Sequence, residues 1–405
     1  MNTRRNFIKQ TLAGSALISL SGAVPQYWLG ASRAALLQSD EKILVVVQLS
    51  GGNDGLNTVI PHGFDEYYQN RFTLAVNQQN VLKINDQIGF HPALDDFKRL
   101  QDDGQLTIIQ GVGYANPNRS HFESMDLWHT AHRTEGVRQL GWLGRTVEQA
   151  WNISDLPALH LGEGLQPLAL RTDQKPIPSV RSLQEFRLHV LANNEASTLL
   201  EPLLKSAPHP KNQLLSYLHD SSQIARATSH RLDGIAPVAD GRFGYPDSNL
   251  GRNLNVIAQL IESGLSTRIY YVTLDGFDTH SNQGPAHQGL LSDLGSSLGA
   301  FMKQLTQQNN QQRVAVLSFS EFGRRVRENA SAGTDHGAAA PVFLLSGAVS
   351  QQIVGDHPDL QDLDEGDLKF KIDYRQIYAD VLQNWLQVDS DDVLGNRFEP
   401  LGLFV

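Results

Sequence analysis

Long apolar runs alternate with amphipathic stretches along most of the chain. The run at 43–49 is continuous and rich in β-branched residues, which is typical of a strand buried on both faces of a parallel sheet. Similar runs predict strands at 106–112, 268–274, 314–319 and 341–345. These segments are the expected strands of one central sheet.

Helical periodicity fills the intervals between these runs. Apolar residues at helical spacing predict helices at about 92–104, 120–132, 254–264, 290–305 and from 373 onward. The first helix connects the first two strands by a crossover long enough for a parallel pair. The alternation predicts an α/β fold with a mostly parallel central sheet flanked by helices.

The helix after residue 120 begins with a recognisable signal. Ser120 with Glu123 three residues later forms the pattern of a capping box. Phe122, Met125 and Trp128 are spaced to face the core from this helix.

Residues 151–250 break the alternation, because prolines interrupt them repeatedly and no long strand stands out. With 405 residues the chain exceeds the length at which one hydrophobic core usually stops growing. We therefore expect one domain over 35–405, with residues 151–250 inserted as a cap over the sheet.

The N-terminus resembles a twin-arginine export signal. Arg4-Arg5 is followed by Phe7, Ile8 and Lys9, and the apolar part Thr11–Val24 is shorter than the roughly 20 residues that span a bilayer. We expect a signal peptide over 1–34, the twin-arginine export machinery as a partner, a periplasmic or otherwise extracytoplasmic location, and no permanent membrane span. Removal of this segment deletes four basic residues and no acidic ones, which changes the net charge from −10 to −14.

Composition narrows the chemistry. The chain contains no cysteine, which excludes disulfides, thiolate metal sites and a cysteine nucleophile. Its acidic balance argues against a nucleic-acid partner. The sequence lacks a Gly-x-Ser-x-Gly elbow, a phosphate-binding Walker loop and a His-Glu-x-x-His motif.

Acidic residues and histidines follow several predicted strands or, in one case, precede one. In open α/β sheets, ligands bind at the carboxyl ends of the strands. Such residues from separate loops are able to hold one or two divalent ions, with Zn, Mn, Mg and Ca as candidates. The candidate metal ligands are Asp54, Asp278, His280, Glu321, Asp335 and His336.

Ser120 has two competing roles. As a helix cap, its hydroxyl accepts a backbone N–H. As a nucleophile, it stands at the positive end of a helix, where an anionic ester is attracted. Arg119 and Arg324 are candidates for binding the oxygens of that anion. His91 and His121 are candidate leaving-group acids or supporting residues, although a structural role suits both.

Four stretches in order resemble one bacterial exported family, catalogued as domain of unknown function 1501 within the alkaline-phosphatase-like and sulfatase-like superfamily. They are 47–57, with Gly51-Gly52-Asn53-Asp54; 118–122, with Asn-Arg-Ser-His; 276–283, with Asp278-Thr279-His280; and 320–325 together with 333–337. The resemblance covers about 43–390.

This resemblance implies a metal site and a nucleophile. By order along the chain, Asp54 is similar to the acid after the first strand, and Ser120 to a helix-capping nucleophile. Asp278 with His280 corresponds to a metal pair, and His336 to a late metal histidine. Phe322 stands where a histidine is expected, so either Glu321 or the pair Asp335-His336 completes the site.

The resulting hypothesis is an exported, metal-dependent hydrolase of phosphate or sulfate esters with Ser120 as nucleophile. The alternative is a non-catalytic protein of the same fold that binds an extracytoplasmic polymer or protein.

Overall fold

The predicted apolar runs form the middle of the central sheet. They are β1 (Ile43–Ser50), β5 (Leu106–Gly113), β8 (Ile269–Asp275), β9 (Val314–Ser320) and β10 (Ala340–Leu345). Nearly all of their residues are buried, as continuous apolar strands require when helices cover both faces of a sheet. The computed structural model describes residues 41–132, 138–150, 156–175, 177–180 and 241–405. The predicted signal peptide lies outside the described residues.

The sheet has the order β11-β5-β10-β9-β1-β8-β6-β7, and β14 also pairs with β5. The outer strands are β6 (Ala158–Leu161), β7 (Ser179–Val180), β11 (Ile353–Val354) and β14 (Ile372–Asp373). All pairings are parallel except those of β10, which runs antiparallel to both β5 and β9. The prediction of an α/β fold with a mostly parallel sheet is confirmed.

The first crossover differs from the expected parallel pair. Strands β1 and β5 point in the same direction, but β9 and β10 lie between them. The connection from β1 to β5 therefore passes over two strand positions, which β9 and β10 from later in the chain occupy.

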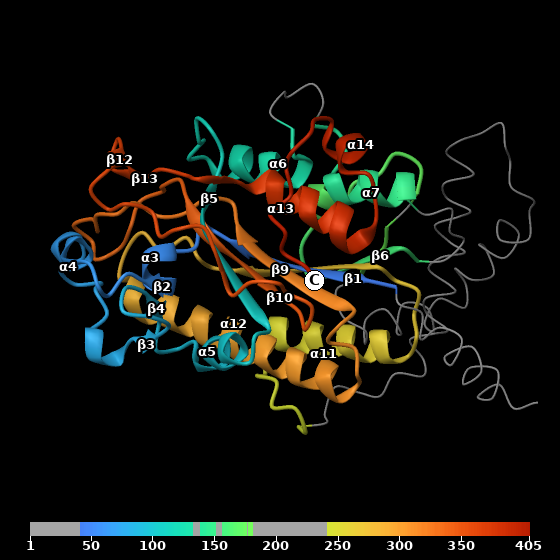
Figure 1. Ribbon diagram of the computed structural model, residues 1–405, viewed down its shortest axis with the longest axis horizontal. Coiled ribbons are helices and arrows are strands. Elements are labelled where there is room, and N and C mark those ends of the chain that lie inside the picture. The colour runs from blue at the N-terminus through green and yellow to red at the C-terminus, as the bar shows by residue number, and fades with distance from the viewer. Residues whose placement is uncertain (1–40, 133–137, 151–155, 176, 181–240) are drawn as a thin grey trace, which may run out of the picture. The chain divides into compact units, whose positions relative to one another are not determined.

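Helices cover both faces of the sheet (Figure 1). On one face α5 (Asp95–Asp102), α11 (Asn249–Glu262) and α12 (Gln283–Gln307) pack into a continuous apolar core. On the other face α6 (His121–Thr130), α7 (Trp142–Ala150), α13 (Tyr374–Asp380) and α14 (Ser390–Leu394) pack into a second core. Between α13 and α14, residues Val381–Leu386 form a π-helical segment.

Smaller elements surround the end of the sheet that carries the site. They are α3 (Gly55–Thr58), α4 (Asp65–Asn70), the three-stranded sheet of β2 (Val59–Ile60), β4 (Gly89–Phe90) and β3 (Leu82–Lys83), and the hairpin of β12 (Leu363–Asp364) and β13 (Asp367–Leu368). Among the described residues, 3-10 turns occur at Gln78–Asn80 and Leu168–Leu170.

The start of the predicted insertion belongs to the sheet instead. Strand β6 pairs with β8, and β7 pairs with β6. Short strands between prolines lack the long apolar run that marked the others, which explains why the sequence pattern did not show them. Residues 181–240 of the predicted insertion lie outside the described residues.

Helix α6 begins where predicted but without the predicted capping box. Ser120 is the N-cap residue, yet its side chain makes no capping hydrogen bond. The Oδ1 of Asn118 accepts the Ser120 N–H at 2.8 Å, and Glu123 pairs with Arg138 instead of reaching back. Phe122 is 86% exposed rather than buried, because Leu127 and Trp128 define the face that meets the core.

Within the described part of the chain, no helix combines the length and the apolar character that a membrane span requires.

Candidate functional site

The candidate residues gather at one edge of the sheet because of strand direction. Parallel strands β1, β8 and β9 end at this edge, so Asp278 and Glu321 follow strands that stop side by side. Strand β10 runs the other way and therefore begins at the same edge. Its reversed direction brings His336, which precedes β10, next to residues that follow β8 and β9.

Two glycines allow these loops to approach closely. Gly51 and Gly52 have φ values of 115° and 78°, which L-residues rarely adopt. A Cβ on Gly51 would stand 2.4 Å from the backbone nitrogen of Asp278, and one on Gly52 would meet the Phe322 ring at 2.4 Å. The loop after β1 thus packs directly on the loops that carry the site.

Four side chains converge here, namely His121, Asp278, His280 and His336. The Oδ1 atom of Asp278 lies 3.0 Å from His280 Nε2, 3.2 Å from His336 Nε2 and 3.4 Å from His121 Nε2. The Nε2 atoms of His280 and His336 are 2.9 Å apart. We call these four residues the His/Asp cluster.

The opposite nitrogen of each imidazole faces an acceptor. His121 Nδ1 donates to Glu321 Oε1 at 2.8 Å, and His336 Nδ1 donates to the Arg119 carbonyl at 2.7 Å. His280 Nδ1 lies 3.4 Å from Asp335 Oδ1. Because these partners only accept, the protons belong on Nδ1, and the Nε2 lone pairs point into the cluster. Lone pairs that face one another and a carboxylate oxygen repel each other, and a cation bound between them would remove this repulsion.

A single metal ion fits the donor atoms of His121, Asp278 and His336, which all lie within 4.8 Å of one another, and His280 Nε2 lies beside two of them. Ligands bound at about 2.0–2.2 Å to one ion, with angles of about 90–109°, stand roughly 2.9–3.5 Å from one another. The contacts given above fall within this range. The buried Nε2 atom of His121 has no hydrogen-bond partner among the described residues. Three imidazoles and one carboxylate favour Zn²⁺ or another transition ion over Mg²⁺ and Ca²⁺, which prefer oxygen ligands.

Charge around Asp278 keeps its carboxyl group ionised. Partial burial alone would raise its pKa, but the hydrogen bond and the positive charge of Arg324 lower the pKa to about 2. The hydrogen bond to the Glu321 carboxylate raises the pKa of His121.

Glu321 contacts the cluster through the Nδ1 atom of His121. The carboxylate is buried and accepts from the Gly51 N–H at 2.9 Å, in addition to its bond with His121. Its other oxygen lies 3.0 Å from Ser320 Oγ. Glu321 therefore orients His121, in the way that carboxylates commonly orient metal-binding histidines. Asp335 occupies the same kind of position beside His280.

Asp54 is engaged elsewhere. Arg71 donates to both of its oxygens, at 2.6 and 3.0 Å, and Gln283 donates to Oδ2 as well. Burial by itself would raise the pKa of Asp54, but the Arg71 guanidinium lowers it to about 2. A carboxylate with these partners already has its charge balanced.

Arg324 is buried and fully engaged. It donates to the carbonyls of Gly51, Gly52, Phe277 and Thr334, and to Asp278 Oδ1 at 2.7 Å. It therefore ties together the loops after β1 and β8 and the segment before β10. This arrangement makes Arg324 a positioning residue.

Ser120 directly precedes the cluster residue His121 in the chain. It is exposed, and it lies between Arg119, whose carbonyl binds His336, and the cluster residue His121. The Arg119 side chain turns away to Asp367, with Nε 2.9 Å from Oδ2. The Ser120 hydroxyl is therefore next to the cluster in the chain and is not used as a helix cap.

His91 lies away from the cluster. Its ring contacts that of His287, its Nδ1 accepts the Ala93 N–H, and burial lowers its pKa to about 4. This environment is that of a structural histidine.

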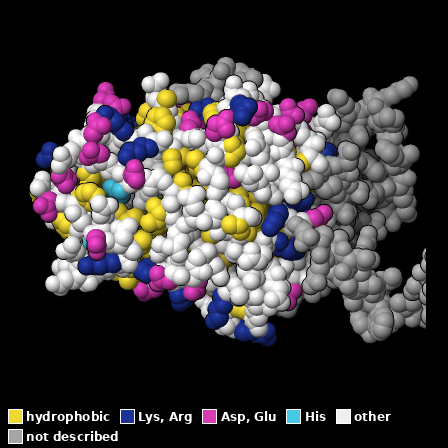
Figure 2. All heavy atoms as spheres, in the orientation of Figure 1, with side chains coloured by type: hydrophobic (Ala, Val, Ile, Leu, Met, Phe, Trp, Pro, Cys, Tyr) yellow, Lys and Arg dark blue, Asp and Glu magenta, His cyan; other side chains and the backbone are white. Residues whose placement is uncertain are grey.

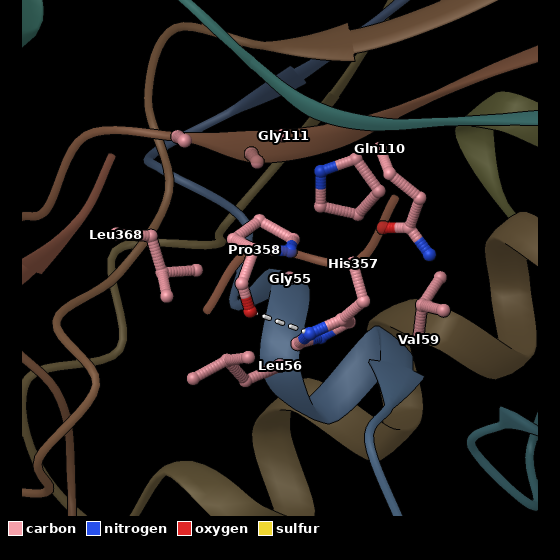
Figure 3. A pocket seen from close by; sticks show the side chains of 11 residues that line it. Gly55, Leu56, Val59, Gln110, Gly111, His357, Pro358 and Leu368 are labelled. Atoms are coloured by element: carbon pink, nitrogen blue, oxygen red, sulfur yellow. Dashed lines mark hydrogen bonds between the residues drawn. The ribbon is translucent and has the colours of Figure 1, made fainter. Parts of the chain in front are cut away.

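A small pocket lies nearby without including the cluster (Figure 3). It is lined by residues of α3, β5 and the start of β10, including Leu56 and Gln110, and by His357 and Pro358. None of its lining residues belongs to the His/Asp cluster.

Two residues near the site have roles that the sequence did not predict. The sequence predicts His121 as a leaving-group acid or a supporting residue and not as a member of the metal cluster, although it directly follows Ser120 in the Asn-Arg-Ser-His motif. Arg71 carried no signal, because only the fold brings it to Asp54 across 17 positions.

Solved structures with a similar fold are distant. They include a sulfatase from Pseudoalteromonas sp. (10% identity, 83% of this chain and 69% of that one, TM-score 0.37). Others are the lipoteichoic acid synthase LtaP from Listeria monocytogenes (10%, 87% and 75%, TM-score 0.36) and a protein in the alkaline phosphatase superfamily from Vibrio parahaemolyticus (9%, 78% and 62%, TM-score 0.37). We transfer no residue role from them.

No curated protein matches the sequence. A family profile does match, over residues 41–395, and its description is "Protein of unknown function (DUF1501)". The match covers most of the chain and includes all four residues of the His/Asp cluster, and the protein accordingly belongs to the DUF1501 family.

Proposed function

We propose that the protein is a metal-dependent hydrolase of phosphate or sulfate esters that uses one divalent ion. The observation that carries this proposal is the convergence of three imidazole Nε2 atoms on Asp278 Oδ1, with acceptors facing the Nδ1 side of each ring. His121, Asp278, His280 and His336 would hold the ion, which would supply Lewis acidity toward an anionic ester.

One ion suits the site better than two. Asp54, the acid that a second site would use, is neutralised by Arg71 and bonded to Gln283. Glu321 and Asp335 serve the histidines instead of forming a second set of ligands.

Ser120 is the proposed nucleophile. Its exposed hydroxyl is not engaged as a cap and stands at the N-terminus of α6, where the helix dipole favours negative charge. Ser120 Oγ would form a bond to phosphorus or sulfur as it gives up its proton and the ester alcohol leaves. Water would then cleave the seryl ester, releasing the anion and restoring the serine.

The test combines elemental analysis with turnover, on protein purified without chelator. We expect about one divalent ion per chain, lost in His336→Ala. Ser120→Ala is expected to keep the ion and the fold but to lose at least about 10³-fold in kcat on aryl phosphates or aryl sulfates. Ser248→Ala, which removes a true capping serine from α11, is the matched control and is expected to retain activity.

Three outcomes would count against the proposal. Failure to take up zinc, manganese or iron would contradict the proposed metal site. Full activity in Ser120→Ala would contradict the assignment of Ser120 as the nucleophile. A bound ion with no turnover on either ester class would favour the non-catalytic binding protein.

We also propose that residues 1–34 direct export by the twin-arginine route to an extracytoplasmic location. The support is the Arg4-Arg5 motif and the short apolar segment after it. Replacing both arginines by lysine is expected to leave the precursor uncleaved in the cytoplasm, as fractionation and mass spectrometry would show. Cleavage of that variant as in wild type would contradict the assignment.

A further inference from the structure

Arg119 and Arg325 share one buried carboxylate beside the His/Asp cluster. Asp367, on β13, is 1% exposed. Its Oδ2 atom accepts from Arg119 Nε at 2.9 Å, and its Oδ1 atom lies 3.7 Å from Arg325 Nε. A single buried carboxylate thus faces two guanidinium groups.

The backbone of each arginine contacts the segment that carries His336. The Arg119 carbonyl accepts from His336 Nδ1 at 2.7 Å. The Arg325 N–H donates to the Asp335 carbonyl at 3.0 Å. The backbone of both arginines therefore lies at the margin of the cluster.

The outer side of the arginine pair is only loosely neutralised. The side chains of Arg119 and Arg325 are 36% and 33% exposed. Asp367 Oδ1 makes no hydrogen bond within the described residues, although it is buried. The other acid nearby, Glu365, is 78% exposed, and its Oε2 is 3.6 Å from Arg119 Nη2, which exceeds hydrogen-bond length.

Glu365 reaches Arg119 from the turn between β12 and β13. Glu365 and Gly366 have φ values of 52° and 89°, so this two-residue turn places a non-glycine residue in the left-handed region. The Glu365 carbonyl accepts from Arg325 Nη1 at 2.9 Å, which fixes the turn and leaves the carboxylate in solvent. Glu365 is thus a weakly held anion on a fixed turn.

We propose that Arg119 and Arg325 form a second anion subsite that takes an additional sulfate or phosphate group of a polyanionic substrate, with the Glu365 carboxylate as its internal competitor. This inference rests on the proposed function and narrows its substrate class to esters that carry at least two anionic groups. Arginine suits this role because its planar fork pairs with such groups through two hydrogen bonds.

The charge of the whole chain makes such a subsite useful for a polyanion. The net charge is −10, so long-range attraction opposes binding. On the face in Figure 2, basic side chains occur in small groups among acidic ones rather than as a broad basic patch. A local pair such as Arg119 and Arg325 would provide attraction for a polyanion that the net charge of the chain does not.

A purely structural role makes a different prediction. If the arginines only pinned the β12–β13 hairpin, their replacement would lower the melting temperature without changing anion affinity. Glu365 would then have no effect on affinity. The sign of the Glu365 effect separates the two roles.

The experiment is calorimetric titration of the metal-loaded mature protein with sucrose octasulfate and, separately, inositol hexakisphosphate. Arg325→Gln is expected to weaken binding at least about 10-fold, and Glu365→Gln to strengthen it about 3- to 10-fold. Arg397→Gln, which removes an exposed ion-paired arginine on the C-terminal segment, is the matched control and is expected to bind as wild type. The probe that binds more tightly identifies sulfate or phosphate as the second group.

Equal affinities in Arg325→Gln and Arg397→Gln, or an unchanged affinity in Glu365→Gln, would overturn the subsite. Should Arg325→Gln fail to fold, the Glu365→Gln result decides alone. Repeating the titration after chelator treatment separates this inference from the proposed function. The differences between variants are expected to persist without metal, whether or not the loaded protein hydrolyses esters.

Discussion

Two aspartates at the same edge of the sheet have opposite surroundings. Asp54 follows β1 and meets Arg71, with both side chains fully buried. Asp278 follows β8, is about half exposed, and meets three imidazole nitrogens. Both aspartates follow a strand, so neither residue type nor position separates them. The neighbouring side chains do: Arg71 balances the charge of Asp54, whereas imidazole nitrogens beside Asp278 leave it able to bind a cation.

This contrast predicts a stability effect at Asp54. Asp54→Asn leaves the Arg71 guanidinium buried without its countercharge, which typically costs about 3–5 kcal/mol in the free energy of unfolding. Metal content in the folded fraction is expected to stay at the wild-type level. Urea denaturation and elemental analysis of the same preparation measure both quantities.

Asp102→Asn provides the comparison, because it removes a more exposed ion pair, with Lys98 on α5. Its effect is expected to stay below about 1 kcal/mol. Loss of metal in Asp54→Asn without loss of stability would mean that Asp54 is itself a ligand.

For single residues, the sequence predicted some site positions but not their contacts. The motifs around Asp278, His280 and His336 were visible, because they combine acids and histidines near predicted strands. The engagement of Asp54 was not, because Arg71 lies in a loop with no pattern of its own. Ser120 was ambiguous for the same reason, since Asn118 takes over the turn that a capping serine would have made.

At the scale of elements, the strands and helices of the core were predictable. Continuous apolar runs located β1, β5, β8, β9 and β10, because strands buried on both faces consist mainly of apolar residues. Their neighbours and directions were not predictable. The pattern of β10 is the same whether it runs parallel or antiparallel, yet its direction brings His336 to the site.

The pattern of apolar residues did not predict the short elements. Strands β6 and β7 contain four and two residues, too few for an apolar run to stand out. The turn of the β12–β13 hairpin depends on two positive φ values, and the sequence offers only one glycine there. The hairpin nevertheless supplies Asp367, which holds Arg119.

For the whole molecule, buried neutral histidines predict sensitivity to acid. Burial lowers the pKa of His129 to about 3 and that of His287 to about 4. In the unfolded chain both would titrate near 6.5. Because the unfolded state binds these protons first, stability is full above pH 6.5 and falls as the pH drops toward 4.

The expected loss is about 1.6 kcal/mol per histidine between pH 6.5 and pH 5. Urea denaturation of chelator-treated protein at both pH values measures the loss. In His129→Gln the difference between the two pH values is expected to shrink by about that amount. An equal pH dependence in the variant and the wild type would show that His129 does not carry it.

The ligands of the cluster are widely spaced along the chain, at 121, 278, 280 and 336 of 405 residues. No partial chain that lacks the segment before β10 contains the complete donor set. During synthesis, an ion would therefore be fully enclosed only after most of the polypeptide has been made and the sheet has assembled. If the proposed site binds metal, its loading would be a late event in biogenesis, because it requires the segments around His121 and His336 to have come together.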